Sequence, residues 1–390
     1  MTIGIDKIGF ATSQYVLKLQ DLAEARGVDP EKFSKGLLLN EISIAPLTED
    51  IVTLAASASN SILTDKEKEE IDMVIVATES GIDQSKAAAV FVHGLLGIQP
   101  FARSFEIKEA CYGATAALHY AKLHVENSPE SKVLVIASDI AKYGVGTPGE
   151  PTQGAGSVAM LITQNPRIMA FNNDNVAQTR DIMDFWRPNY SSTPYVNGMY
   201  STQQYLDCLT TTWDEYKKRY DWTMDDFAAI CFHLPYPKLA LKGLRKMMDK
   251  TLSQEKKDSL QENFDKSILY SQMIGNIYTG SLFLGLLSLL ENAETLKAGD
   301  KIALYSYGSG AVSEFFSGEL VEGYEAYLDK ERLSKLQQRT ALSVADYEKV
   351  FFEEVQLDES GSAQFAAYEN QDYALVEIVD HQRRYSKVEK

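Results

Sequence analysis

Four short apolar runs alternate along the chain with longer segments of helical composition. Each run is bounded by polar or turn-forming residues, a pattern typical of strands that are buried on both faces. The runs are residues 73–77, 133–137, 228–232 and 302–306. The helical segments, rich in Ala, Leu and Lys, are residues 86–96, 114–125, 238–247 and 280–290. This alternation predicts an α/β fold with a largely parallel sheet.

The order of these elements repeats in the second half of the chain. The first half reads MVIVATES, EACYGATAALHYAKLHV, KVLVIASDIAKYG and GAGSVAMLI, and the second reads AAICFHLPYPK, GNIYTGSLFLGLLSLLE, KIALYSYGSG and AVSEFFSGELV. Few residues are identical, but Cys111 precedes Tyr143 by 32 residues and Asn276 precedes Ser309 by 33. We therefore expect two similar α/β halves, residues 1–165 and 166–390, packed as layered sheets and helices around one shared site.

Two segments lie outside the repeated pattern. Residues 171–222 are rich in Tyr, Thr and Asn, and we expect them to form an insertion that lines a pocket. From about residue 325 onward the chain is an acidic, Tyr-rich extension in which no catalytic motif is visible. Within it, Ser343 and Asp346 have the spacing of a helix start, and residues 373–379 have the composition of a strand.

The acidic charge balance narrows the range of partners. The 390 residues include 55 Asp and Glu against 38 Lys and Arg, a formal net charge of -17. Such a charge repels nucleic acids and anionic membranes, so neither is expected, and a small anionic ligand would need a local cluster of basic residues. No signal peptide or membrane-spanning run is visible, and the longest apolar stretch, residues 282–290, predicts a fully buried helix.

Three widely spaced cysteines offer neither a disulfide framework nor the paired spacing of a metal site. We expect reduced thiols in a cytoplasmic protein. Cys111, in KEACYGATAALHY, precedes a predicted helix whose N-terminal dipole and free amide groups would favour a thiolate nucleophile. A buried structural cysteine is the alternative interpretation, and we give it to Cys208 and Cys231.

A cysteine nucleophile needs an acid–base partner, and the chain has five histidines. Four of them lie on helix bodies or in the charged C-terminal tail: His93, His119, His124 and His381. Only His233 stands at the end of a strand, where Pro235 and Pro237 hold the following chain in an extended turn. Position alone leaves a catalytic and a structural role open for it.

Three other polar residues are candidates for chemistry. Glu79 follows an apolar strand, where a hydrophobic wall raises a carboxyl pKa toward the range of proton transfer; its alternative is a dipole-stabilised residue at a helix start. Asn276 in GNIYTG is either a helix cap or a donor to a substrate carbonyl. Ser309 in YGSGA either fills a tight turn or brings backbone amides to an oxyanion.

Lys238 and Lys242 share one face of the helix after His233 and are the candidate phosphate clamp, with a solvated helix face as the alternative. A G-x-G-x-x-G pattern over residues 144–149 is a false signal. Pro148 interrupts it, and the strand-like GAGSVAMLI follows where a dinucleotide site has a helix.

Taken together, EACYGATAAL, FHLPYPKLALK, GNIYTGSL and YSYGSGA resemble the motifs of hydroxymethylglutaryl-CoA synthases, and EPTQGAGSVAML resembles the family's stretch after the third strand. The resemblance covers nearly the whole chain and implies the thiolase-like fold. It implies that Cys111 is the acylated nucleophile and Glu79 the general acid/base of condensation. It implies that His233 lies in the acetoacetyl thioester site, where it orients the acceptor and protonates it.

The same matching implies further ligand-contacting positions, namely Asp29, Thr152, Ser201, Lys238, Lys242, Asn276 and Ser309. Tyr143 joins them because its loop faces the nucleophile. Two stretches depart from the family: residues 36–42 read GLLLNEI where Gly-x-Gly-Gln is usual, and residues 146–149 read GTPG where an Asn is usual. Both departures concern local substrate contacts.

The resemblance implies an acyltransferase of the mevalonate pathway of isoprenoid biosynthesis. It would join acetyl-CoA to acetoacetyl-CoA as a cytoplasmic homodimer, with coenzyme A thioesters as substrates and no metal or other cofactor. A ketoacyl synthase of the same fold is the nearest alternative, although its decarboxylation needs no proton-abstracting carboxylate such as Glu79. A non-catalytic acyl-CoA-binding protein is the other alternative, and it would be expected to lack the nucleophile or the base.

Overall fold

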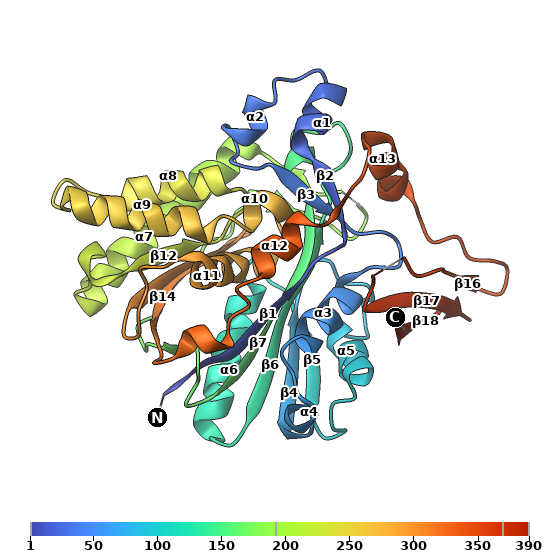
Figure 1. The fold of residues 1–390 in the computed structure, drawn as a ribbon, viewed down its shortest axis with the longest axis horizontal. Coiled ribbons are helices and arrows are strands. Elements are labelled where there is room, and N and C mark those ends of the chain that lie inside the picture. The colour runs from blue at the N-terminus through green and yellow to red at the C-terminus, as the bar shows by residue number, and fades with distance from the viewer. Residues whose placement is uncertain (1, 192, 369, 389–390) are drawn as a thin grey trace.

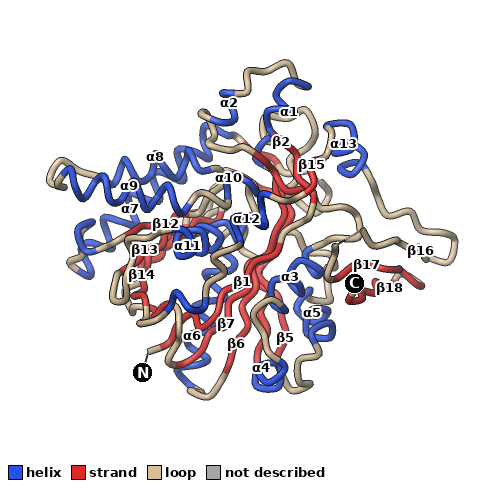
Figure 2. The backbone as a smooth tube through the Cα atoms, in the orientation of Figure 1, coloured by secondary structure: helices blue, strands red, loops and turns tan. Residues whose placement is uncertain are grey.

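The computed structural model describes residues 2–191, 193–368 and 370–388. A ten-stranded sheet runs through the middle of the molecule (Figures 1 and 2). In spatial order its strands are β12 (Ala229–Phe232), β13 (Lys301–Gly308), β14 (Val312–Leu320), β8 (Met169–Phe171), β1 (Ile3–Ala11), β7 (Gly154–Gln164), β6 (Lys132–Ala141), β4 (Ile71–Ala77) and β5 (Arg103–Ile107), and β9 (Val176–Thr179) also pairs with β14. The four strands predicted from the apolar runs are confirmed as β4, β6, β12 and β13.

The prediction of a largely parallel sheet is wrong. Only the pairs β4–β5, β4–β6 and β12–β13 are parallel, and the remaining pairs of the large sheet are antiparallel. The reason is that β7 and β14 return directly beside β6 and β13 without a crossover helix, which only antiparallel neighbours can do. Strands that are buried on both faces have the same apolar composition whether they run parallel or antiparallel to their neighbours, so the sequence does not show their direction.

Helices and sheet alternate in layers, which confirms the predicted layered α/β arrangement. The first half is residues 1–165 and the second half is residues 166–390. Two central helices, α6 (Gly113–Asn127) and α11 (Ser281–Asn292), share one apolar core with the inner faces of both halves. The outer face of the first half packs against α3 (Ile51–Asn60) and α5 (Ala88–Leu96). The outer face of the second half packs against α7 (Gly198–Tyr220), α8 (Pro237–Met247) and α9 (Gln254–Ser267). As predicted, α11 is buried on all sides.

Shorter elements surround these layers. A small sheet joins β2 (Tyr15–Lys18), β3 (Glu41–Ile44) and β15 (Thr340–Ala341), and β10 (Phe185–Trp186) pairs with β11 (Tyr195–Val196). The short helices include α1 (Leu19–Ala25), α2 (Glu31–Ser34), α4 (Asp65–Glu70), α10 (Ser271–Ile274) and α12 (Arg332–Gln337). Among the helices of the described ranges, none is long and apolar enough to cross a bilayer.

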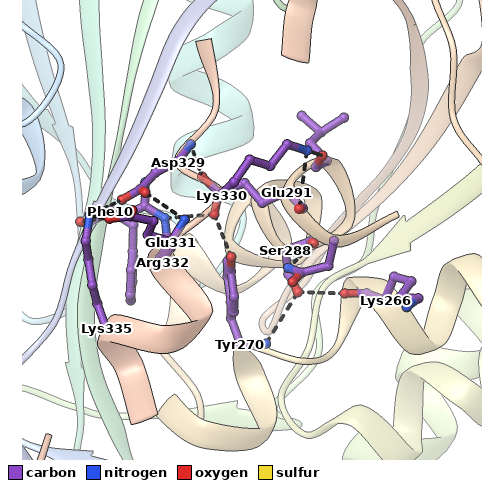
Figure 3. Close-up of polar contacts among 12 residues, drawn as sticks. Phe10, Lys266, Tyr270, Ser288, Glu291, Asp329, Lys330, Glu331, Arg332 and Lys335 are labelled. Carbon is purple, nitrogen blue, oxygen red and sulfur yellow. Dashed lines mark hydrogen bonds and ion pairs between the residues drawn. The ribbon is translucent and has the colours of Figure 1, made fainter. Parts of the chain in front are cut away.

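The C-terminal extension is tied to the body at several points. Glu291 of α11 accepts hydrogen bonds from the Tyr270 hydroxyl (2.6 Å), the Asp329 amide (3.0 Å) and Arg332 Nε (2.9 Å), as Figure 3 shows. Beyond it come α13 (Val344–Phe352), capped by Ser343 as predicted, and a sheet of β16 (Ala363–Gln364), β17 (Tyr373–Val379) and β18 (Gln382–Lys387). The predicted late strand is confirmed as β17, and the extension ends beside α5 (Figure 1).

Candidate active site

Cys111 and Glu79 meet at the carboxyl end of the first half's parallel strands. Glu79 lies two residues beyond β4, and Cys111 lies between β5 and α6. The Cys111 thiol donates a hydrogen bond to Glu79 Oε1 at 3.1 Å. Ala110 has a φ of +40°, in the left-handed region that a non-glycine residue rarely adopts, and this turns the chain sharply at the nucleophile. The structure thus brings together two of the residues predicted from sequence.

A buried aspartate, Asp139 in β6, holds this region in place. Its Oδ1 accepts hydrogen bonds from the Thr78 hydroxyl (2.9 Å), the Glu79 amide (2.9 Å) and the Ser80 hydroxyl (2.7 Å). Its Oδ2 accepts one from the Thr279 amide at 3.2 Å, and the Thr279 hydroxyl accepts one from the Ala114 amide at 2.7 Å. Asp139 therefore connects Glu79 with the beginnings of both central helices.

Burial governs protonation at this pair of side chains. Burial, followed by the nearby charge of Asp139, raises the pKa of Glu79 from 4.5 to about 8. Burial raises the pKa of Asp139 to about 6. Burial and the adjacent Glu79 also raise the pKa of the Cys111 thiol above its usual value. The expectation that the α6 dipole would stabilise a free thiolate is therefore wrong, because burial and a neighbouring carboxylate outweigh the dipole. Glu79 is instead placed to take the proton of the thiol.

His233 directly follows β12, and its side chain is buried. Burial lowers its pKa from 6.5 to about 3, so the imidazole is neutral at neutral pH. Within the described ranges its Nδ1 has no hydrogen-bond partner. The backbone carbonyl of His233 accepts from the Tyr205 hydroxyl (2.9 Å), and the Tyr205 ring packs against Tyr307. A buried neutral imidazole with an unused nitrogen is suited to hydrogen-bonding a ligand.

Asn276 and Tyr143 are in direct contact across the two halves. The Asn276 side-chain amide donates to the Tyr143 hydroxyl at 2.9 Å, and its Oδ1 accepts from the Tyr278 amide (2.8 Å) and the Ser281 hydroxyl (2.8 Å). Asn276 thus holds the turn that precedes α11 and presents its amide to the other half. The helix-cap interpretation is wrong, because the N-cap of α11 is Gly280, which makes no side-chain cap hydrogen bond. The Tyr143 ring also packs edge-on against Phe185 of the inserted segment.

Ser309 lies half-buried in the turn between β13 and β14, against the nucleophile loop. A Cβ added to Gly308 would lie 2.7 Å from the Tyr112 amide nitrogen and 2.7 Å from the Glu109 carbonyl, so this close approach requires glycine. The buried Asp184 supports the turn by accepting from the Gly310 amide (2.9 Å) and the Tyr307 hydroxyl (2.7 Å). The Ser201 hydroxyl donates to the same carboxylate at 3.4 Å.

The hydrogen bonds of the remaining predicted residues go to groups other than Cys111. Lys238 is half-buried and Lys242 exposed on α8, and the Lys238 amide donates to the Leu37 carbonyl (3.1 Å) in the stretch that departs from the family pattern. Asp29 is exposed between α1 and α2, and its carboxylate accepts from the Glu31 amide at 2.9 Å. The Thr152 hydroxyl bonds the Gly149 carbonyl within its own turn (2.8 Å).

A cavity of about 580 Å³ lies beside Glu79. Its lining comes from the start of α3, from the strand ends and from the segment predicted to line a pocket: Asp50, Ile51, residues 78–84, Glu106, Lys108, Ile140, Lys142, Arg187, Pro188, Asn189 and Ser191. Arg187 also donates to the backbone carbonyl of Glu79. The prediction that residues 171–222 border a pocket is confirmed.

Two family models, one for each part of the same enzyme, together cover nearly the whole chain. The hydroxymethylglutaryl-coenzyme A synthase N-terminal model matches residues 2–167, and the C-terminal model of the same enzyme matches residues 175–257 and 245–387. The chain belongs to the hydroxymethylglutaryl-CoA synthase family. The fold and the residues around Cys111 agree with this assignment.

Individual synthases show the same relationship. The hydroxymethylglutaryl-CoA synthase of Enterococcus faecalis is 55% identical over 360 residues, which cover 92% of this chain and 94% of the relative. A crystal structure of an HMG-CoA synthase complexed with CoA covers 100% of both chains at 68% identity, with a TM-score of 0.98. The structure of MvaS in complex with 3-hydroxy-3-methylglutaryl coenzyme A covers 100% of this chain and 99% of that one at 32% identity, with a TM-score of 0.88.

Sequence reasoning missed three groups around the synthase site. Asp139 carried a usable signal, because β4 and β6 pair in parallel with Ala77 opposite Ala137, which places residues 138 and 139 beside Glu79. Asp184 and Arg187 lie in irregular chain between β9 and α7, where no periodicity locates a side chain.

The raised pKa of Glu79 predicts a pH-dependent stability difference in a Glu79→Gln variant. Between about pH 4.5 and about pH 8 the folded chain binds more protons at Glu79 than the unfolded chain, so wild-type stability falls as the pH rises through this window. Glutamine does not titrate. The melting temperature of the variant should therefore exceed that of the wild type increasingly toward about pH 8, with little difference near pH 4.5. The exposed Glu130→Gln is the control, and a difference independent of pH would contradict the raised pKa.

Proposed function

We propose that this chain condenses acetyl-CoA with acetoacetyl-CoA and water, giving 3-hydroxy-3-methylglutaryl-CoA and CoA through an acetyl group on Cys111. The observation that carries the proposal is the hydrogen bond between Cys111 and a Glu79 carboxyl group whose pKa is about 8. A nucleophile and a base in contact are what acyl transfer followed by proton abstraction requires. Family membership places the reaction in the mevalonate pathway of isoprenoid biosynthesis.

The first half-reaction transfers the acetyl group. As Cys111 Sγ attacks the thioester carbon of acetyl-CoA, the Glu79 carboxylate accepts the thiol proton. The tetrahedral oxyanion collapses, the bond to the CoA sulfur breaks, and the proton passes from Glu79 to the departing thiolate. The glycine turn that carries Ser309 and presses on the nucleophile loop is the candidate source of amide donors to the oxyanion.

In the second half-reaction the Glu79 carboxylate removes a proton from the acetyl methyl group. The resulting enolate attacks the ketone carbon of acetoacetyl-CoA, and the new alkoxide takes a proton from the Glu79 carboxyl group, which has just received one. His233 and Asn276 orient the ketone by hydrogen bonding. Because the pKa of His233 is about 3, hydrogen bonding suits it better than delivery of a proton. Water then hydrolyses the thioester to Cys111.

We assign the coenzyme A portion to the lysines of α8 in the second half. Lys238 and Lys242 on α8, with Asp29, Thr152 and Ser201, are the proposed ligand contacts along with Tyr143 and Ser309. Thioester activation and fixed protein dipoles supply the electrophile, so the proposed reaction calls for no metal or redox cofactor.

A steady-state assay tests the overall reaction. The purified chain should consume acetoacetyl-CoA only when acetyl-CoA is present, and chromatography should identify hydroxymethylglutaryl-CoA as the product. Release of carbon dioxide from a malonyl thioester would favour the ketoacyl synthase instead. Binding of both thioesters without turnover would indicate the non-catalytic alternative.

We predict that His233→Ala affects the acceptor step specifically. The imidazole is buried and has an unused nitrogen, so its loss removes a hydrogen bond to acetoacetyl-CoA and leaves the contact between Cys111 and Glu79 in place. KM for acetoacetyl-CoA should rise about tenfold or more, whereas the rate of Cys111 acetylation should stay unchanged. Equal loss of both half-reactions would assign His233 a structural role.

We also propose that the chain is a homodimer of the cytoplasm, as the family resemblance implied. The position of β5 at one end of the large sheet supports the homodimer, since an edge strand can pair with another chain. Sedimentation at micromolar concentration that showed only monomer would contradict it.

The cysteines support a reducing compartment, because Cys208 and Cys231 are buried free thiols.

A further inference from the structure

The acidic C-terminal extension carries a tyrosine that reaches into the first half of the molecule. Tyr347 of α13 is only 1% exposed. Its hydroxyl donates to Glu150 Oε1 at 3.2 Å and accepts from Gln153 Nε2 at 2.8 Å. Both partners belong to the loop between β6 and β7, far from Tyr347 in sequence. A buried hydroxyl with both of its roles in use is held in one orientation.

Gln153 passes this contact on to the backbone of Tyr143. Its Oε1 accepts from the amides of Tyr143 (2.8 Å) and Gly144 (3.2 Å). Two backbone donors on the oxygen fix which end of the amide group faces Tyr143, so the NH₂ end must face the Tyr347 hydroxyl. Gln153 is 3% exposed, and breaking either contact would leave a buried polar group without a partner.

Glu150 locks the other side of the same loop. Arg26, directly after α1, binds it in a bidentate manner, with Nε at 3.0 Å and Nη2 at 2.8 Å, and the Gly146 amide donates to it at 3.0 Å. Arg26 Nη2 also contacts Glu348, the neighbour of Tyr347, at 2.7 Å. The carboxylate therefore joins α1, the loop and α13, which lie together at one end of the molecule (Figure 1).

The loop is packed directly against the acceptor side of the site. A Cβ on Gly149 would come within 2.8 Å of Tyr143 Cβ, and one on Gly154 within 2.6 Å of the Asn276 carbonyl. The Thr152 carbonyl accepts from the Asn276 amide at 3.2 Å, and the Asn276 side chain donates to the Tyr143 hydroxyl. A shift of this loop therefore displaces Tyr143 and Asn276 together.

The extension that delivers Tyr347 is fixed before it reaches α13. Arg332 is bound to Glu291 (Figure 3), and Arg339 donates to the Met273 carbonyl at 2.8 Å and to Glu41 at 3.3 Å. With these anchors in place, the position of α13 is set by the body of the molecule.

We propose that Tyr347 is a positioning residue of the condensation step: acting through Gln153 and Glu150, it holds the loop that presents Tyr143 to the acyl acceptor. The proposal gives the C-terminal extension a part in the reaction although it carries no catalytic group. Among the residues that the structure describes, no hydrogen bond links this contact chain to Glu79 or Cys111, so we expect acetylation to proceed at its normal rate without it. The inference rests on the proposed synthase function.

Tyr347→Phe tests this proposal by separating the two half-reactions. The variant keeps the ring and removes the hydroxyl. The rate of Cys111 acetylation by acetyl-CoA, followed by intact mass, should stay at the wild-type value. The rate at which the isolated acetyl-enzyme reacts with acetoacetyl-CoA should fall about tenfold, the effect of misplacing one directing hydrogen bond. Tyr324→Phe is the matched control, since Tyr324, directly before the extension, is also 1% exposed but its hydroxyl donates to the Leu296 carbonyl.

A second variant checks that the effect travels through Gln153. Gln153→Ala should slow condensation in the same way, and combining it with Tyr347→Phe should add little, because both act on one contact chain. Unchanged condensation in Tyr347→Phe would overturn the proposal, as would parallel loss of acetylation and condensation, or full additivity. A wild-type enzyme that acetylates but forms no hydroxymethylglutaryl-CoA would instead overturn the proposed function.

Discussion

Cys111→Ala should abolish both acetylation by acetyl-CoA and the formation of hydroxymethylglutaryl-CoA. Cys111 is the only cysteine of the three that is not fully buried, and its sulfur contacts a carboxyl group. Cys208 and Cys231 are 1% and 0% exposed and lie in apolar cores, so neither can take over. Loss of a covalent nucleophile costs on the order of 10⁴-fold or more in turnover. Intact mass and the steady-state assay measure the two effects.

Cys208→Ala is the matched control for this change. It removes a thiol from the apolar core of the second half without touching the site, so it should lower the melting temperature and leave acetylation on Cys111 intact. Acetylation of Cys111→Ala to the wild-type extent would contradict the assignment of the nucleophile.

Glu79→Gln should acetylate but fail to condense. Glutamine keeps the shape of the side chain and an oxygen that can accept from the Cys111 thiol, but it cannot remove a proton from the acetyl methyl group. General base catalysis contributes about 10²- to 10⁴-fold, and the loss in condensation should fall in that range. Acetylation should be slower than in the wild type, because Glu79 also takes the thiol proton, and should still run to completion.

The measurement for Glu79 is the rate of each half-reaction by quenched-flow mass analysis. Glu109→Gln is a suitable control, because Glu109 lies in the same loop as Cys111 but the Cys111 thiol donates its hydrogen bond to Glu79. If both half-reactions of Glu79→Gln fell by the same factor, Glu79 would act on the thiol alone, and another base for condensation would be required.

The sequence predicted those parts of the site that follow directly from regular elements. Glu79 and His233 stand at strand ends, and a strand's end is visible as the point where an apolar run stops. Cys111 was visible because it directly precedes a predicted helix, and the two central helices were visible from their length and composition. The motifs around Cys111, His233, Asn276 and Ser309 then supplied the family, which no single position could have done.

What the sequence could not supply depends on tertiary packing. The direction of β7 and β14 is invisible in their apolar composition, so the sheet is mixed where a largely parallel one was predicted. The pKa of the Cys111 thiol is raised because burial and Glu79 outweigh a helix dipole, and both depend on the tertiary structure. The contact between Tyr347 and Gln153 joins segments separated by 194 residues, and no local pattern marks either partner.

The most direct test of the central claim, that the acetyl group on Cys111 becomes part of the product, is a single-turnover chase. The enzyme is loaded with isotopically labelled acetyl-CoA, freed of unbound thioester, and mixed with unlabelled acetoacetyl-CoA. The account predicts that label leaves Cys111 at a rate at least equal to turnover and is recovered in hydroxymethylglutaryl-CoA. Label recovered only as acetate or acetyl-CoA, with none in the product, would contradict it.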